Sequence, residues 1–336
     1  MALPPSTNPA RPRHALLLVP ESSRSSVRVH GPASLSNLGP GFDAVGLCIG
    51  GFGDVVEGRW RETPGVQVTV EGGAVPADPD RNTAACAAAA VLRRAGVERG
   101  LHLHVQKGIP LGSGIGGSSA SAVAGAWAAN LLLGEPFRRS ELVEAVLDGE
   151  AATGARHGDN VLPALLGGLV LVDPSDPARY RRIVLPRPLH VALLLPDLAV
   201  LTEEARRLLP RSVPLPDAVA NAADLAFLVD AFRAGDWETV GRQIMRDRLV
   251  EPVRARLVPC YDAVRRAALE AGAYGCALTG SGPAMFAPAE THAAARTVAS
   301  AMEAACRAAS IEATAHATHA DERGVRRQDE GMNDAA

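Results

Sequence analysis

The chain has 336 residues, of which 47% are hydrophobic, and a formal net charge of −3. This length suffices for two domains with substantial cores. The small negative charge excludes the large basic field that many nucleic-acid-binding proteins carry, so we expect no nucleic-acid partner. The early apolar run 15–20 is too short for a signal segment or a membrane span, so we expect no membrane partner. The five cysteines are scattered, which favours a reducing cytoplasm over a disulfide framework or a zinc site.

The first ordered segment is expected after a disordered extension. Residues 1–26 are rich in proline, serine and arginine and show no sustained periodicity. Order is predicted to begin at Val27, in an alternating strand that leads into a glycine- and proline-marked loop. Asn37 and Asp43 lie in this loop as candidate ligand groups, although both could instead hydrogen-bond their own turn.

Strand and helix patterns follow. Valines recur through residues 46–71, which predicts strands. The alanine-rich segment 82–95 predicts a helix, for which Asn82 is a suitable N-cap. Asn82 could instead contact a bound nucleotide.

The glycine-rich stretch from Lys107 to Asn130 carries the clearest chemical signal. It lies between an alternating strand, Leu101–Val105, and an alanine-rich helix that should end at Gly134. Glycines let amide N–H groups approach a ligand closely, and a helix start adds unpaired donors, so this stretch suits an anion such as a polyphosphate. Hydroxyls that could bind phosphate or Mg²⁺ come from Ser113, Ser118, Ser119 and Ser121.

Other readings of the glycine pattern remain open from the residues alone. An ordinary Walker loop is unlikely because Lys107 precedes the glycines. The spacing from Gly112 to Gly117 matches the dinucleotide pattern G-x-G-x-x-G, but the acidic residue expected about 20 positions later, Glu135, lies beyond the helix stop. A tight turn without a ligand is the third alternative.

Downstream of the glycine loop, two polar groups stand out. Ser140 is expected to cap a helix over 140–152, with Glu150 near its end as either an exposed glutamate or a metal ligand. His157, Asp159 and Asn160 form a polar turn. This turn could be a site, or a capping aspartate beside a satisfied histidine.

The second half begins after the proline-marked stretch 175–188. Thr202 and Arg206 are four residues apart on a short helical piece and therefore share a face. Arg206 and Arg254 could be solvated surface charges or anion ligands. The other expected features are helices over 221–234, 239–248, 261–271 and 291–309, a glycine turn at 277–283, and a polar, disordered C-terminal tail.

Three separated segments resemble motifs of the GHMP kinase superfamily: PASLSNLGPGFDAVGL at 32–47, PLGSGIGGSSAS at 110–121 and ALTGSGPA at 277–284. HGDNVLPALLGGL at 157–169 and EPVRARLVP at 251–259 are similar to the homoserine kinase family in particular. The resemblance implies an α+β fold in two domains: an ATP-binding domain over 27–180, like ribosomal protein S5 domain 2 with a left-handed βαβ crossover, and a ferredoxin-like domain over 181–315. A disordered tail would occupy 316–336.

The resemblance further implies a kinase that phosphorylates the hydroxyl of L-homoserine with ATP and Mg²⁺, in threonine biosynthesis. It assigns the metal to Ser118 and Glu150. Where the family usually has two serines after Gly116, this chain has Gly117 and then Ser118. Nucleotide contacts are implied for Asn82, Lys107, Pro110, Leu111, Gly112, Ser113, Gly114, Ile115, Gly116, Gly117, Ser118, Ser119 and Ala120.

A zwitterionic substrate needs a carboxylate for its ammonium and arginines for its carboxylate. By resemblance, Asp43 takes the first role and Arg206 and Arg254 take the second. Asn37, Asn160 and Thr202 would orient the rest of the molecule. Asn160 would hold the reacting hydroxyl, with His157 as the alternative proton acceptor, and catalysis would depend on Asn160, Ser118 and Glu150. The alternatives are another small-molecule kinase of the superfamily or a non-catalytic binding relative; the assembly could be a homodimer.

Overall fold

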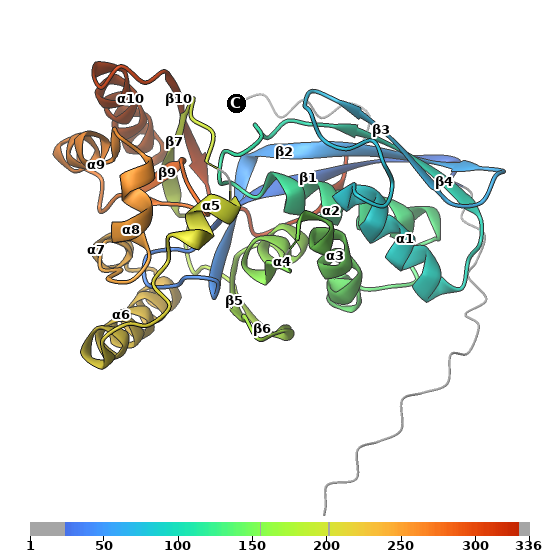
Figure 1. The fold of residues 1–336 in the computed structure, drawn as a ribbon, viewed down its shortest axis with the longest axis horizontal. Helices are drawn as coiled ribbons and strands as arrows, with labels where there is room; N and C mark the ends of the chain where they lie inside the picture. The colour runs from blue at the N-terminus through green and yellow to red at the C-terminus, as the bar shows by residue number, and fades with distance from the viewer. Residues whose placement is uncertain (1–23, 155, 201, 329–336) are drawn as a thin grey trace, which may run out of the picture.

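The computed structural model describes residues 24–154, 156–200 and 202–328. It has two halves, each built on its own sheet (Figure 1). The first sheet has the strand order β11-β1-β2-β4-β3, and β5 pairs with β2 and with β6. Its strands are β1 (Ser26–Ser36), β2 (Val45–Arg61), β3 (Val66–Glu71), β4 (Gly100–Gln106), β5 (Leu169–Asp173), β6 (Asp176–Ile183) and β11 (Arg326–Arg327).

Helices cover one face of the first sheet (Figure 1). Helix α1 begins where expected, because the Asn82 side chain accepts hydrogen bonds from the amides of Ala84 and Ala85. It joins β3 to β4, which run parallel. The helix expected from Ser140 starts later, at Val143, because residues 139–141 form a separate 3₁₀ turn. These helices are α1 (Thr83–Ala95), α2 (Gly117–Leu132), α3 (Val143–Glu150) and α4 (Gly158–Leu166), with 3₁₀ turns η1 (Arg139–Glu141) and η2 (Ala151–Thr153).

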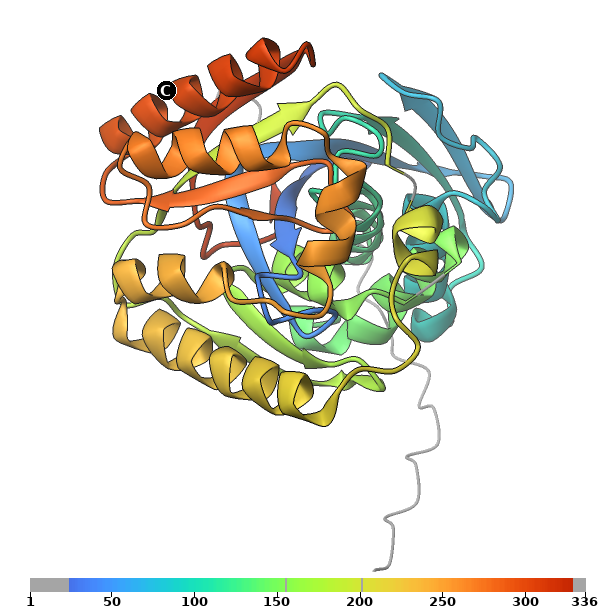
Figure 2. The ribbon, with the colours of Figure 1, turned by 60° about the vertical axis from the view of Figure 1, so that its left-hand side comes forward.

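The second sheet has the strand order β10-β7-β9-β8. Its strands are β7 (His190–Pro196), β8 (Ala277–Leu278), β9 (Met285–Ala289) and β10 (Ala313–His319). Helices α9 and α10 lie on one side of this sheet, and α6 and α7 lie on the other (Figure 2). The helices of this half are α5 (Thr202–Arg207), α6 (Leu215–Ala234), α7 (Trp237–Ile244), α8 (Glu251–Arg254), α9 (Tyr261–Glu270) and α10 (His292–Ala308), with the 3₁₀ turn η3 (Ala255–Leu257).

Alternating side chains of β7 connect the two halves. Ala192 and Leu194 pack into the core under α9 and α10. Leu193 and Leu195 face the opposite way, into a core that also contains Leu35 of β1. Because this second core draws on both sheets, it fixes the seam between the halves, where the functional residues gather.

Two predicted domain limits are wrong. The limit between residues 180 and 181 falls inside β6, so the chain passes between the sheets after Ile183. Residues 316–328 are not disordered, because β10 continues to His319 and Arg327 pairs with Val29 of the first sheet. Residues 1–23 and 329–336 of the predicted disordered ends lie outside the described residues.

Within the described ranges, no helix combines the length and the apolar character that crossing a bilayer requires.

Candidate active site

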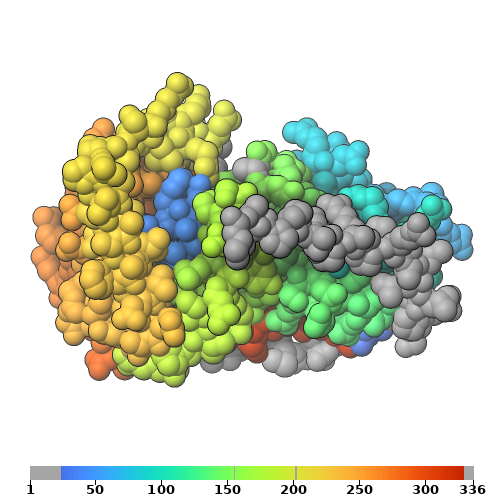
Figure 3. Space-filling view, turned by 90° about the horizontal axis from the view of Figure 1, so that it is seen from below, coloured from blue at the N-terminus to red at the C-terminus, as the bar shows by residue number. Residues whose placement is uncertain are grey.

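A cavity of about 430 Å³ lies at the seam between the halves, lined by residues of both. In the space-filling view, the blue segment from the start of the described chain reaches the surface between the yellow helices of the second half and the green segments of the first (Figure 3). The cavity is therefore built from segments that are far apart in the sequence.

The glycine loop forms one end of this cavity. Gly112, Gly114 and Gly116 adopt positive φ angles, which favour glycine. Gly116 is also the N-cap of α2, and among the described residues no side-chain cap is made to the first-turn amides of that helix. These amides and the helix dipole favour an anion in the cavity.

Residues 277–284, which belong to the second half of the molecule, support the glycine loop. A Cβ at Gly114 would lie 2.8 Å from the Thr279 carbonyl oxygen, so only glycine permits this approach. The Thr279 hydroxyl donates to the Gly114 carbonyl at 3.3 Å, and the amide of Ala284 donates to the Ser113 carbonyl at 3.2 Å. The loop is therefore held in place by both halves.

Lys107 lies beneath the loop with its ammonium buried. The ammonium forms an ion pair with the buried Asp54 and donates to the Gly117 carbonyl at 2.9 Å and to the Ser121 hydroxyl at 3.0 Å. Asp54 also accepts from Ser121 at 2.6 Å and from the amide of Gly108 at 3.1 Å. Lys107 thus ties the start of α2 to the middle of β2, and in this structure its charge is already paired.

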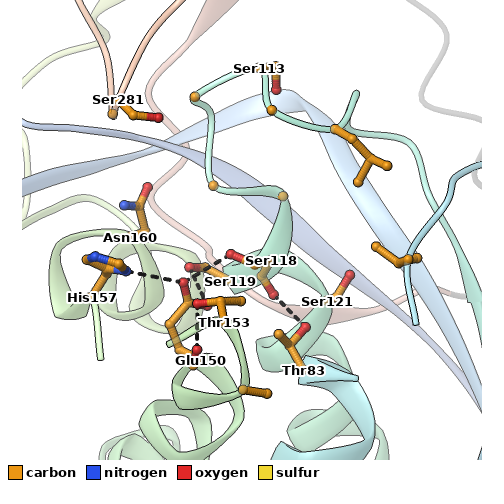
Figure 4. A pocket seen from close by; sticks show the side chains of 18 of the residues that line it. Thr83, Ser113, Ser118, Ser119, Ser121, Glu150, Thr153, His157, Asn160 and Ser281 are labelled. Carbon is orange, nitrogen blue, oxygen red and sulfur yellow. Dashed lines mark hydrogen bonds and ion pairs between the residues drawn. The ribbon is translucent and has the colours of Figure 1, made fainter. Parts of the chain in front are cut away.

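Glu150 faces two hydroxyls of the first turn of α2 (Figure 4). Ser118 donates to Oε1 of Glu150 at 3.0 Å, and Ser119 donates to Oε2 at 3.0 Å. The Nδ1 atom of His157 lies 3.7 Å from Oε1, and this interaction raises the pKa of His157. A carboxylate and a hydroxyl side by side on the wall of the cavity are oxygen donors of the kind that Mg²⁺ prefers.

Asp159 is a buried carboxyl in the first turn of α4. Burial raises its pKa to about 6, and the nearby Asp43 adds to this effect, while His157 and a hydrogen bond with Ser36 oppose it. Its charge is therefore costly in the ligand-free protein.

The opposite end of the cavity carries charged groups from both halves. Arg206 of α5 binds both carboxylate oxygens of Asp43, at 2.9 and 3.0 Å. Arg254, from α8, donates through Nη1 to the Gly280 carbonyl at 2.7 Å, whereas its buried Nε has no hydrogen-bond partner among the described residues. The Asn37 amide binds the same carbonyl at 2.8 Å and accepts from the Asp43 amide at 2.8 Å.

Asn160 lies between the two ends. Its Oδ1 accepts from the Ser34 hydroxyl at 3.1 Å, and its Nδ2 donates to the Ser36 hydroxyl at 2.9 Å. A Cβ on Gly116 would lie 3.1 Å from Asn160 Oδ1, so this amide lies directly beside the phosphate loop.

Most of the predicted site residues line this one cavity, but two whose side chains the structure describes do not. Ile115 and Ala120 are fully buried in the core shared by the halves, so their side chains cannot contact a nucleotide. Thr202 begins α5, and its side chain lies outside the described residues. Glu135, the acidic residue of the dinucleotide alternative, forms an ion pair with Arg24 and does not line the cavity.

Two residues of the site, Asp54 and Phe42, were not predicted from the sequence, and a third, Asp159, was predicted without a specific role. Asp54 could have been sought as the partner of the only lysine in the chain, whose uniqueness we attribute to composition. Asp159 belongs to the polar turn for which the sequence leaves a site or a helix cap open; it lines the cavity, and the N-cap of α4 is His157. Phe42, beside Asp43, has no polar group that would mark it as a site residue.

The chain matches the families described as GHMP kinases N terminal domain, over residues 82–168, and GHMP kinases C terminal, over residues 228–308. It is 44% identical to a homoserine kinase of Pyrococcus abyssi over 262 residues, covering 77% of this chain and 86% of the relative. It is 41% identical to a homoserine kinase of Xylella fastidiosa, covering 87% and 90%. A crystal structure of homoserine kinase from Cytophaga hutchinsonii superimposes with a TM-score of 0.88 at 36% identity, covering 91% of this chain and 98% of that one. The chain therefore belongs to the homoserine kinase family of the GHMP kinases.

Proposed function

We propose that this chain transfers the γ-phosphoryl group of ATP to the side-chain hydroxyl of L-homoserine, giving ADP and O-phospho-L-homoserine. The main support for this proposal is that one cavity has two chemically different ends. One end offers glycine-loop amides and a helix start to an anion, and the other offers a carboxylate and two guanidiniums.

The loop end suits the phosphates of ATP. Ser118 and Glu150 would hold Mg²⁺, since their oxygens meet at 3.0 Å and phosphate oxygens and water can complete the coordination that this ion prefers. When bound, Mg²⁺ would neutralise negative charge on the phosphates. Asn82 caps α1 at the cavity wall, where its amide could also contact the adenosine part.

The other end suits the amino acid. Asp43 would take the ammonium, and Arg206 and Arg254, which both line the cavity, would take the carboxylate. Asn37 and Thr202 would orient the same substrate. Arg206 and Asp43 form an ion pair, so a zwitterion can replace both partners without leaving an unpaired charge.

Phosphoryl transfer through a loose transition state depends on in-line positioning and charge neutralisation more than on a strong base. We propose that Asn160 holds the substrate hydroxyl; its position beside both Gly116 and the strand β1 that leads to Asn37 supports this role. The hydroxyl would then face the γ-phosphate. Its oxygen would form the new P–O bond while the bond from the γ-phosphorus to the bridging oxygen of ADP breaks, and its proton would pass to an oxygen of the transferred phosphoryl group.

We place this reaction in threonine biosynthesis and in the cytoplasm, and we propose a homodimer. Leu215, Val219 and Phe227 on the outer face of α6 are 74%, 60% and 61% exposed. An apolar face on a 20-residue helix, about 30 Å long, can pack against its own copy across a two-fold axis. Light scattering should give twice the chain mass for the wild type and the chain mass for Phe227→Glu; equal masses would contradict this interface.

The reaction is tested by ADP release from purified protein with homoserine, threonine, mevalonate or galactose as acceptor. We expect rapid release with homoserine alone. Release with mevalonate or galactose instead would indicate another GHMP small-molecule kinase. Calorimetric binding of ATP and homoserine without ADP release would indicate a non-catalytic relative.

A further inference from the structure

Phe42 lies beneath both arginines of the substrate end. The guanidinium carbon of Arg254 is 4.9 Å from the centre of the Phe42 ring, and that of Arg206 is 5.5 Å from it. Both distances are within the range of about 6 Å in which a cation is attracted to the face of an aromatic ring. The two arginines come from α5 and α8, so this ring is a shared contact for separate elements.

Two guanidiniums that bind one carboxylate must lie close together although they repel each other. Burial lowers the pKa of Arg254, and the positive charge of Arg206 adds to this effect. Each guanidinium is anchored at one edge, Arg254 by the Gly280 carbonyl and Arg206 by Asp43. The ring adds an attractive contact common to both, which offsets part of their repulsion.

The position of the ring is fixed by its loop. Asn37 and Asp43 have φ angles of 57° and 54°, which are unusual for residues with side chains. The Asn37 side chain accepts from the Asp43 amide, and the amide of Val45 donates to the Gly41 carbonyl at 3.0 Å. Phe42 is therefore held in place before any substrate arrives.

We propose that Phe42 is a specificity-determining positioning residue: its ring holds Arg206 and Arg254 so that both guanidiniums face one substrate carboxylate. This inference rests on the proposed function. An alcohol without a carboxylate gains nothing from the arrangement, so Phe42 favours amino acids over amino alcohols.

The test compares Phe42→Leu with Phe42→Tyr, which keeps the ring. We expect Phe42→Leu to raise the KM for homoserine about tenfold, the loss expected for two cation–π contacts at a partly exposed site, with the KM for ATP and the kcat within about twofold of wild type. Phe42→Tyr should stay within about threefold of wild type in all three constants. Phe42→Met serves as the second ring-free variant if Phe42→Leu does not fold.

A carboxylate-free acceptor separates positioning from general damage. With 3-amino-1-propanol, kcat/KM should be the same for the wild type and the ring-free variant. An equal fall in kcat/KM for both acceptors, or an unchanged homoserine KM in the ring-free variant, would overturn the role of Phe42. Failure of the proposed function would be distinct, because the wild type itself would then not phosphorylate homoserine.

Discussion

The phosphate end and the substrate end of the cavity differ in how their charged groups are partnered. At the phosphate end, Lys107 and Asp54 are buried and satisfied by each other and by backbone groups of the loop. At the substrate end, Asp43 and Arg206 are partly exposed and paired across the seam, and Nε of Arg254 has no hydrogen-bond partner within the part of the chain that the structure describes. The first arrangement stabilises the conformation of the glycine loop before the nucleotide binds. In the second arrangement, the charges of Asp43, Arg206 and Arg254 can form new ion pairs with the ammonium and the carboxylate of a zwitterion.

This difference predicts that mutations at the first end change stability and catalysis, whereas mutations at the second change substrate choice. The largest effect is expected for Asp54→Ala, which leaves the Lys107 ammonium buried without its counter-charge. Breaking a buried ion pair in this way costs about 3–5 kcal/mol of unfolding free energy. Urea denaturation followed by circular dichroism measures it.

Asp236→Ala, which removes the exposed N-cap of α7, is the matched control and should cost about 1 kcal/mol. If Asp54→Ala cost no more than this control, the phosphate loop would not depend on the buried pair.

Glu150→Gln tests the catalytic part of the phosphate end. The amide keeps the shape but lacks the charge that we assign to the metal, so kcat should fall about 10²–10³-fold, the usual cost of removing one electrostatic contact to the transition state. Homoserine binding, measured by calorimetry, should not change. Steady-state kinetics over a range of Mg²⁺ concentrations should show a higher requirement in the variant.

Glu144→Gln on the same helix provides the control, because the Glu144 side chain is 61% exposed and pairs with Arg156. A variant at position 150 with the kcat and Mg²⁺ dependence of this control would refute the assignment.

Asp159→Asn probes the buried carboxyl between the ends. Its pKa of about 6 in the folded protein lies above the unfolded value of about 3.9, so its contribution to stability is present below pH 4 and is lost as the pH rises through 6. Asparagine resembles the protonated form. The variant should therefore be more stable than wild type by about 2–3 kcal/mol at pH 8 and equally stable near pH 4.

Urea denaturation at the two pH values measures this difference, with Asp262→Asn on the exposed face of α9 as the control. A stability gain that is the same at pH 4 and pH 8 would show that the charge of Asp159 is not its cause.

The two ends also differ in how far the sequence predicted them. The phosphate end is largely one contiguous stretch, and strand, glycines and helix cap are local signals that Leu101–Asn130 carries by itself. Residues 277–284 and Asp54, which hold this loop in place, lie far from it in the sequence. The local pattern of residues therefore could not predict these contacts. The substrate end combines Asp43, Arg206 and Arg254, which only the family resemblance brought together.

The fold of the C-terminal segment also depends on contacts with distant residues, which the local sequence does not predict. Residues 316–328 are polar and charged, which favoured disorder. The strand β11 has two residues, too few for the alternation of apolar and polar side chains that would predict a strand. It forms by antiparallel pairing with β1 at the edge of the first sheet. Likewise, Ser140 has the right side chain for a helix cap, but the preceding 3₁₀ turn moves the start of α3 to Val143.

The central claim is that Asp43 selects the ammonium of the substrate at an end separate from the phosphate loop. It is tested by the kcat/KM of wild type and Asp43→Asn for homoserine and for 4-hydroxybutanoate, which lacks the amino group. We predict that the wild type prefers homoserine by about 100-fold or more and that Asp43→Asn loses this preference while its KM for ATP is unchanged. An undiminished preference in Asp43→Asn would contradict the account.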